Sequence, residues 1–249
     1  MRNKNQKIDP EFWRDIIVRN CKACGGKGIL TKDDYEGSVE LCRCSRMVRL
    51  FVKMNDPEHG LHPKYHKWTL NNAIDLLPSS KEMIKKYIKI IDSNHPYRNG
   101  LIVGEKNAGK SSVAAILYKE LMTREYDVSV VRFSELASLS RMFISNTQGF
   151  NDRKEFYEMI KDEEFLIIED IDSRGHSNSI NFEKLGYSLL DDVFSYRANH
   201  PSRSTILTVD DGLNITESTL GHVFYYSIYT SDIEDNKLFR IPVKTSKHN

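Results

Sequence analysis

Apolar and polar positions follow two patterns along the chain. Short, mainly apolar runs bounded by polar or turn-forming residues predict buried strands. Longer stretches with apolar side chains every three or four positions predict amphipathic helices. The strands predicted in this way span residues 100–103, 128–133, 165–168 and 204–209. The predicted helices span residues 45–54, 110–124, 156–161 and 182–198, with one more helix after an N-cap at Ser79 or Ser80.

From residue 100 onward, predicted strands and helices alternate. This order is typical of an α/β fold in which helices flank a parallel sheet. Upstream of it, the turn-forming segment 55–63 follows a predicted helix and indicates a linker. We therefore expect an N-terminal module over residues 1–60 and an α/β domain over residues 61–249.

Composition and charge support this division. Of the 249 residues, 39% are hydrophobic and 29% are charged, which is typical of a globular protein and excludes a disordered or fibrous chain. Residues 1–100 carry a net charge of +7 and residues 101–249 a net charge of −6. No apolar run approaches the roughly 18 residues that span a bilayer, and the first ten residues lack the apolar core of a signal peptide. We expect a cytoplasmic protein with no membrane partner.

A phosphate-binding loop is predicted between the strand over 100–103 and the helix that follows. The segment from Gly104 to Ser111 is a complete G-x-x-x-x-G-K-[ST] motif. Its glycines allow a tight turn whose N–H groups point at phosphates, and the helix N-terminus adds partial positive charge. Lys110 is expected to reach the β- and γ-phosphates, and the Ser111 hydroxyl to bind Mg²⁺. A chance glycine-rich turn is the alternative. The predicted ATP-binding residues are Gly104, Glu105, Lys106, Asn107, Ala108, Gly109, Lys110, Ser111 and Ser112.

Two carboxylates follow the apolar run over 165–168. In an open α/β sheet, ligands bind at the carboxyl ends of the strands. We expect Glu169 to hold Mg²⁺ and Asp170 to polarise the water that attacks the γ-phosphate. The first acid of such a pair is usually Asp, and Glu is one methylene longer. A solvated acidic turn that includes Asp172 is the alternative.

All four cysteines of the chain lie close together in the sequence, as Cys21-x-x-Cys24 and Cys42-x-Cys44. Four thiolates suit tetrahedral Zn²⁺, and a site closed by four protein ligands is structural rather than catalytic. Disulfides are disfavoured in the cytoplasm. A redox role for the Cys-x-x-Cys motif lacks the surrounding βαβ unit. We expect one structural zinc ion.

These motifs, in this order, resemble the DnaC/DnaI-type replicative helicase loaders of the AAA+ ATPases, particularly the shorter phage-encoded members. The resemblance covers nearly the whole chain and rests on the zinc motif joined to the ATPase motifs. Further similar segments are the entry to the ATPase domain at 61–71, a strand and helix start at 128–136, the pair Tyr196 and Arg197, Pro201, and the sensor strand at 205–208.

The resemblance implies an AAA+ ATPase that loads a hexameric replicative helicase onto single-stranded DNA. It implies that the N-terminal module binds the helicase and that the ATPase domains assemble into a ring or spiral. Two other functions remain open on the sequence: an ATPase that regulates transposition or recombination, and an ATP-bound helicase adaptor that does not hydrolyse ATP. The candidate DNA-facing cations are Arg132, Arg141, Arg153 and Lys154, with Phe133 or Phe150 as stacking partners for bases. For each of these cations, a solvated position on the protein surface is the alternative.

Two departures from the family's pattern bear on hydrolysis. The family's sensor strand usually ends in Asn, and Asp210 stands at that position here. The family's arginine finger is also missing, because no Lys or Arg lies between Arg203 and Lys237, where Tyr226 and Ser227 take its place. We therefore expect slow ATP hydrolysis.

Arg197 is the remaining candidate for the missing catalytic arginine. It lies at the end of the helix predicted over 182–198, in a region that can border a neighbouring subunit in AAA+ rings. Arg197 either serves the nucleotide of a neighbour or forms a structural salt bridge to Asp191, Asp192 or another acid. The sequence leaves both open.

Overall fold

A computed structural model describes most of the chain. The described residues are 10–31, 39–55, 61–73, 76, 78–93, 99–136, 150–171, 192–193, 195–197, 199–200, 202–210 and 239–243. The chain divides into two compact units. The first comprises residues 1–67 together with 119–126, and the second comprises residues 68–118 and 127–249.

The first unit is built around its cysteines. Helices α1 and α2 pack against each other, and an antiparallel hairpin of β1 and β2 joins them, with Ile29 opposite Leu41. Val18 of α1 and Val48 of α2 form a small buried cluster with Cys24, Cys42 and Cys44. The elements of this unit are α1 (Pro10–Arg19), β1 (Ile29–Thr31), β2 (Val39–Leu41), α2 (Arg43–Met54) and the short 3-10 helix η1 (Pro63–Tyr65).

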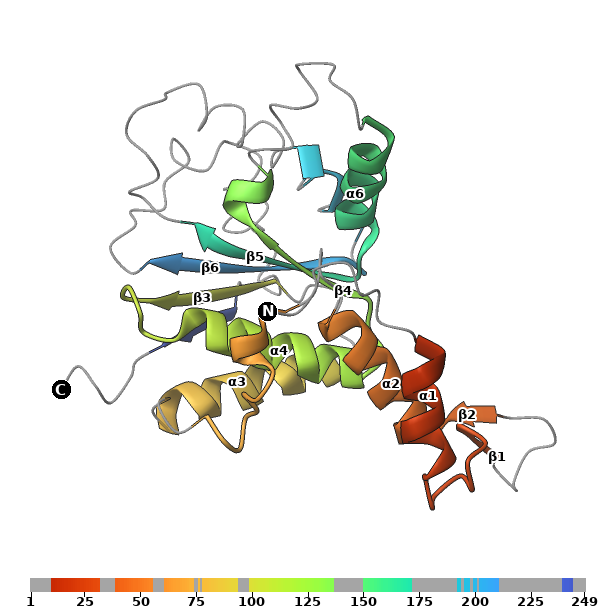
Figure 1. Cartoon of the computed structure of the whole chain (residues 1–249). Coiled ribbons are helices and arrows are strands. Elements are labelled where there is room, and N and C mark those ends of the chain that lie inside the picture. The colour runs from red at the N-terminus through yellow and green to blue at the C-terminus, as the bar shows by residue number, and fades with distance from the viewer. Residues whose placement is uncertain are drawn as a thin grey trace. The chain divides into compact units, whose positions relative to one another are not determined.

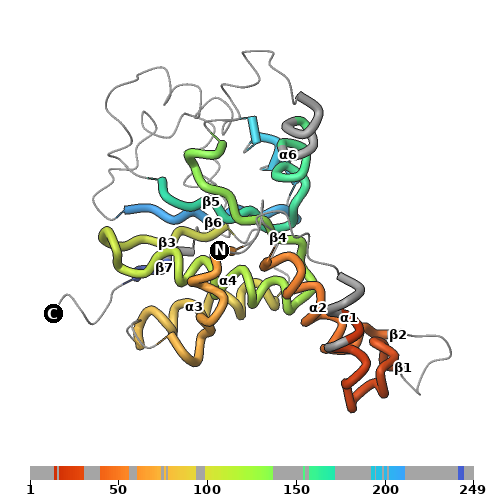
Figure 2. The backbone as a smooth tube through the Cα atoms, viewed as in Figure 1, coloured from red at the N-terminus to blue at the C-terminus, as the bar shows by residue number. Residues whose placement is uncertain are grey.

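The second unit contains a five-stranded parallel sheet in the order β4-β5-β6-β3-β7. β3 lies between β6 and β7, and β7 runs beside it along the edge of the sheet (Figure 2). Because both faces of the sheet are covered, its central strands are buried along most of their length. The strands are β3 (Gly100–Gly104), β4 (Val128–Arg132), β5 (Phe165–Ile171), β6 (Ser204–Asp210) and β7 (Phe239–Pro242).

Helices cover both faces of this sheet, so the unit has three layers with the sheet in the middle (Figure 1). α3 (Pro78–Asp92) and α4 (Lys110–Thr123) lie on one face, and α6 (Phe150–Asp162) lies on the other. On the α6 side, apolar residues of β3, β4, β5 and β6 join one cluster. Its buried members are Leu101, Val103, Val131, Leu136, Ile160, Leu166, Ile168, Ile171, Val193, Leu207 and Val209.

The predicted α/β class and its strands are confirmed, while several boundaries differ. β5 continues through both predicted site carboxylates to Ile171. α3 begins at Pro78, so Ser79 and Ser80 lie inside its first turn rather than at an N-cap. The Ser80 hydroxyl instead donates a hydrogen bond to the Pro242 carbonyl at 2.9 Å, which ties α3 to β7. Most of the helix predicted over 182–198 lies outside the described residues.

Because the strands are parallel, the carboxyl ends of β3, β5 and β6 lie together along one side of the sheet, the edge that crosses the strand ends (Figure 1). Gly104 at the end of β3 pairs with Asp210 at the end of β6. This edge therefore carries the predicted phosphate loop, the predicted carboxylates and the sensor position. Within the described part of the chain, no helix has the length and apolar character needed to cross a membrane.

Candidate functional site

The phosphate loop connects the end of β3 to the start of α4. Ala108 donates its N–H to the Glu105 carbonyl at 3.1 Å, and positive φ angles occur at Asn107 (65°) and Gly109 (97°). Gly104 serves a different purpose from the predicted tight turn, because a Cβ atom there would lie 2.6 Å from the main-chain oxygen of Val243. Glycine at 104 therefore lets the loop pass close to the segment that follows β7.

Lys110, the first residue of α4, is held inside the loop. Its Nζ donates to the main-chain oxygens of Gly104 at 2.9 Å and Glu105 at 2.8 Å. It also forms an ion pair with Asp210 Oδ1 at 2.6 Å. Only 10% of the Lys110 side chain and 17% of the Asp210 side chain are exposed. The resemblance assigned Asp210 to the end of the sensor strand, but its pairing with Lys110 depends on the register of β3 and β6 and was not predicted.

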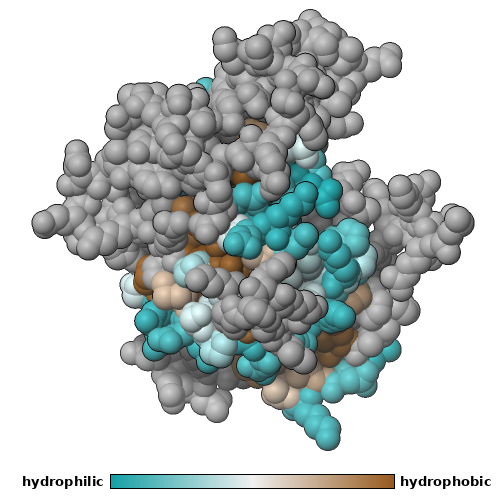
Figure 3. All heavy atoms as spheres, turned by 90° about the vertical axis from the view of Figure 1, so that its left-hand side faces the viewer, coloured by the Kyte–Doolittle hydropathy of each residue, from teal (hydrophilic) through white to brown (hydrophobic). Residues whose placement is uncertain are grey.

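The phosphate loop and the N-terminus of α4 are suited to bind an anion. The first turn of α4 contains no acidic side chain, so its free N–H groups and partial positive charge are not offset within the helix. Ser111 and Ser112 follow Lys110 in this turn and are partly exposed. Figure 3 views the side of the molecule at which the arrows of β3, β5 and β6 end in Figure 1, and polar and apolar residues lie next to each other there.

The two carboxylates of β5 lie at an irregularity of the strand. Ile168 pairs with Leu207 and Ile171 with Val209, so β5 has one residue more than β6 between these pairs. Asp170 adopts a φ of 62°, and its N–H donates to Thr208 Oγ1 at 2.9 Å. Since Ile168 faces α6, alternation along the strand places Glu169 toward the opposite face, the one that α4 covers. The extra residue in β5 lets both Ile168 and Ile171 join the apolar cluster on the α6 side.

Arg197 lies in the interior of the second unit and is only 2% exposed. Its Nη1 donates to the carbonyls of Ile160 at 3.0 Å, Lys161 at 3.1 Å and Glu163 at 2.8 Å, which are carbonyls at and just beyond the end of α6. Its Nε donates to Thr205 Oγ1 at 3.0 Å.

These contacts correct the expectation that Arg197 reaches the nucleotide of a neighbour. Its guanidinium already satisfies carbonyls that the end of α6 leaves without helical partners. Among the described residues, its hydrogen-bond partners are main-chain oxygens and a hydroxyl. The Asp192 carboxylate instead accepts a hydrogen bond from the Tyr157 hydroxyl at 2.8 Å, and Asp191 lies outside the described residues. Burial and the nearby Arg203 lower the pKa of Arg197 to about 9. The structure gives Arg197 a role in holding α6 against β6.

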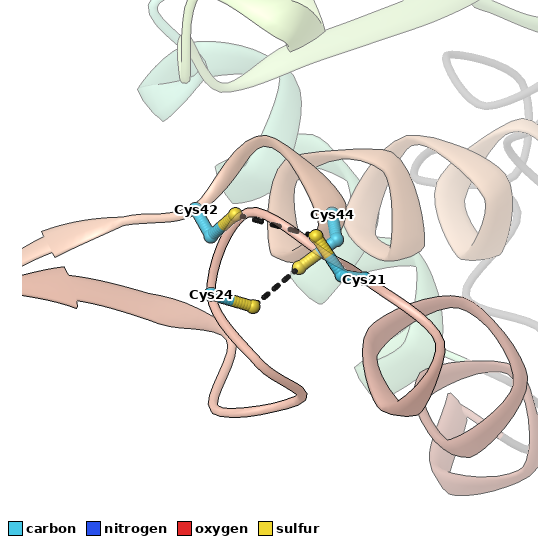
Figure 4. A group of neighbouring side chains, drawn as sticks. All are labelled: Cys21, Cys24, Cys42 and Cys44. Carbon is cyan, nitrogen blue, oxygen red and sulfur yellow. Dashed lines mark hydrogen bonds between the residues drawn. The ribbon is translucent and has the colours of Figure 1, made fainter.

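The four cysteines converge on one point (Figure 4). Their sulfur atoms all lie within 4.8 Å of one another, with Sγ–Sγ distances of 3.7 Å from Cys21 to Cys42 and 3.5 Å from Cys24 to Cys44. A tetrahedron with Zn–S bonds of about 2.3 Å has edges of about 3.8 Å, so the cluster has the dimensions of a zinc site. A disulfide needs an S–S distance of about 2.05 Å, and all four cysteines are free.

The backbone around the cluster supports thiolate ligands. Gly28 donates its N–H to Cys24 Sγ at 3.2 Å and has a φ of 76°. Burial raises the pKa of a thiol, but the Gly28 N–H and the other thiols stabilise the Cys24 thiolate and lower its pKa to about 6. Burial and the neighbouring thiols raise the pKa of Cys44 to about 12. A divalent cation would offset the negative charge of the neighbouring thiolates, which otherwise keeps the Cys44 thiol protonated.

The candidate DNA-facing residues do not form one described surface. Arg132 and Lys154 are exposed, whereas Phe133 packs against the apolar cluster on the α6 side. Arg141 lies outside the described residues, as do Tyr226 and Ser227 at the position of the missing arginine finger.

No protein-family model and no curated protein sequence matches the chain. Solved structures do match. The DnaC helicase loader superposes with a TM-score of 0.54 and 18% identity, over 72% of this chain and 99% of that chain. Domain III of the replication initiation protein DnaA from Thermotoga maritima superposes with a TM-score of 0.50 and 15% identity, over 74% of this chain and 68% of that chain.

The chain has the fold of the DnaC helicase loader. The resemblance noted from the motifs is thereby confirmed at the level of the fold. The clustering of the cysteines is confirmed as well. The roles assigned to individual residues at the carboxyl ends of the strands stay predictions.

Two further contacts of the site were not predicted. Thr208 fixes the Asp170 amide, and the Val243 main chain leaves no room for a side chain at position 104. These residues carry no motif. Their contacts join segments far apart in the sequence, so only the strand order reveals them.

We predict one zinc ion per chain, bound by the four thiolates. Elemental analysis of protein purified under reducing conditions should find this ratio, and Cys24→Ser should lose the metal. Because the cysteines form the core of the first unit, this variant should also lose the thermal transition of that unit. A Cys21–Cys24 disulfide and no metal would contradict the prediction.

We predict that Arg197→Met destabilises the protein by about 3–5 kcal/mol, because it leaves several buried oxygens without a donor. The matched control is Arg203→Met. Arg203 pairs with Asp162, whose side chain is 57% exposed, and donates one main-chain hydrogen bond, to the Lys161 carbonyl at 3.0 Å. Its loss should therefore cost less, about 1–2 kcal/mol. Urea unfolding measures both. Equal losses for the two variants would contradict the structural role of Arg197.

Proposed function

We propose that the chain is an ATP-dependent loader of a hexameric replicative helicase onto single-stranded DNA. One observation carries this proposal: a complete phosphate loop and a four-cysteine cluster occur together in a chain whose fold matches the DnaC helicase loader. The phosphate loop alone occurs in many protein families, whereas the combination is far more specific. The similarity to DnaC is at 18% identity, so loading itself is a proposal.

ATP is the ligand that the phosphate loop supports best. In this proposal the loop N–H groups and the start of α4 bind the phosphates, and Lys110 binds the β- and γ-phosphates. Ser111 and Glu169 would hold Mg²⁺, which neutralises charge on the phosphates. The alternation of β5 supports this role for Glu169, because it directs the residue toward the face that α4 covers.

Asp170 is the proposed group that polarises the attacking water. Its position is set by a left-handed backbone conformation and by the hydrogen bond from its N–H to Thr208. Non-glycine residues rarely adopt this conformation, and such outliers concentrate at functional sites. The arginine that would stabilise the γ-phosphate is then supplied by a partner, since Arg197 is occupied inside the domain.

The first unit, which includes the predicted 1–60 module, is the proposed helicase-binding part. A zinc ion would give this small unit the stability that its short hairpin and two helices do not supply alone. The ATPase domains would assemble side by side into a ring or spiral on the helicase, with single-stranded DNA as the second partner.

A second candidate function is an ATP-bound adaptor that holds the helicase without hydrolysing ATP. The ion pair between Lys110 and Asp210 favours it, because an acid stands where a neutral side chain would orient water. A regulator of transposition or recombination remains the third possibility, and helicase binding separates it from the other two.

We predict that Lys110→Ala weakens MgATP binding at least about tenfold, because a hydrogen bond to a charged group contributes about 1.5–3 kcal/mol. Calorimetric titration measures the change. The matched control is Lys85→Ala, which removes an exposed lysine of α3 with the same loss of charge. Unchanged affinity in Lys110→Ala would remove the phosphate loop from nucleotide binding.

We predict that Asp170→Asn retains MgATP and loses ATP turnover, because the amide cannot accept the proton of the attacking water. Turnover is measured with the helicase and single-stranded DNA present, and Glu169→Gln is the comparison. That variant should weaken Mg²⁺-dependent binding instead. An exchange of the two phenotypes would contradict the assignment of the two acids.

The loader proposal is tested by co-purification with the replicative helicase of the same replicon. Wild type should form a stable complex that requires the zinc site, and Cys24→Ser should lose the complex while retaining MgATP binding. A chain that binds MgATP and duplex DNA but no helicase would support the transposition regulator and overturn the loader.

A further inference from the structure

The ammonium group of Lys110 already has a complete set of oxygen partners. A lysine has three N–H donors, and Lys110 Nζ lies within 3 Å of three oxygens, those of Gly104, Glu105 and Asp210. Two are main-chain carbonyls of the loop itself. The third is a carboxylate, and it is the closest at 2.6 Å.

The fold fixes this carboxylate in place. Asp210 is the last residue of β6, and its strand position pairs with Gly104, the first residue of the phosphate loop. Thr208, two residues earlier on β6, is fully buried and holds the Asp170 N–H, so the end of β6 is anchored. Asp210 therefore lies beside Lys110 because of the sheet register.

A phosphate group must compete with Asp210 for Lys110. Both ligands are anions, and the lysine is largely shielded from water, so their mutual repulsion is weakly screened. An uncharged side chain of the same shape would leave the ammonium available to phosphate without this repulsion.

We propose that Asp210 is a counter-ion of Lys110 that competes with nucleotide phosphates and thereby sets the affinity of the loop for them. This inference rests on the proposed ATP site. Nucleotide binding is then an exchange of anions at Lys110, in which a phosphate oxygen replaces the Asp210 carboxylate. Asp210 stabilises the nucleotide-free protein relative to the nucleotide complex. It therefore lowers the affinity of the site for nucleotide, so that binding needs a higher nucleotide concentration.

The test compares wild type with Asp210→Asn, which keeps the shape of the side chain and removes its charge. Affinities for MgATP, MgADP and AMP are measured by calorimetry, and melting temperatures are measured with and without MgATP. The matched control is Asp162→Asn, which removes the carboxylate of another 2.6 Å ion pair, with Arg203, and makes the same change in net charge. Asp162 lies at the end of α6 and has no part in the proposed site.

Asp210→Asn should bind MgATP and MgADP at least about tenfold more tightly, since Lys110 serves the β- and γ-phosphates. AMP should gain much less. The empty variant should melt at a lower temperature than wild type and show a larger upward shift with MgATP. Asp162→Asn should leave all three affinities unchanged.

Equal or weaker MgATP binding by Asp210→Asn, beside normal binding by wild type, would overturn the counter-ion role and leave the ATP site standing. Weaker binding would show instead that Asp210 positions Lys110 for phosphate. A tenfold gain in affinity for AMP as well would also overturn the counter-ion role. AMP lacks the β- and γ-phosphates that Lys110 serves, so the effect would not act through Lys110. If neither protein binds MgATP, both this inference and the proposed ATP site fail.

Discussion

The Lys110 ammonium and the oxygens around it are the constraint on which the proposed site depends. A largely buried cation at a helix N-terminus needs acceptors, and the loop supplies two carbonyls while β6 supplies a carboxylate. Glycine at 104 brings this part of the loop close to the Val243 backbone, and the register of β3 with β6 places Asp210 opposite it. The same elements that complete the sheet therefore determine which anion Lys110 binds.

The sequence predicted the features that arise from local pattern. Strands of the parallel sheet are buried on both faces, so they appear as short continuous apolar runs, and the run at 165–168 is one of them. The phosphate loop follows from residue types at fixed spacing between a strand and a helix. The cysteine cluster was predictable because both pairs are short-spaced and the chain has no other cysteines. The fold class was predictable for the same reasons.

Features that depend on distant contacts were not predictable. The sequence indicates Arg197 as a possible catalytic arginine. Its structural role is revealed only by its hydrogen bonds to carbonyls at and beyond the end of α6. The pairing of Asp210 with Lys110 needs the strand order, in which β6 lies next to β3. β7 was missed because its four residues include Arg240 and Pro242 and lack an apolar run, although the strand completes the edge of the sheet beside β3. The left-handed conformation of Asp170 depends on one extra residue in β5.

In the proposed function, the chain uses ATP at the phosphate loop to place a helicase on DNA. The most direct measurement is transfer of the hexameric replicative helicase onto closed circular single-stranded DNA, which has no end for the ring to thread. The account predicts transfer with wild type and MgATP, and none with Lys110→Ala or without nucleotide. Transfer that is independent of both the nucleotide and Lys110, or a helicase that never reaches the circle, would contradict it.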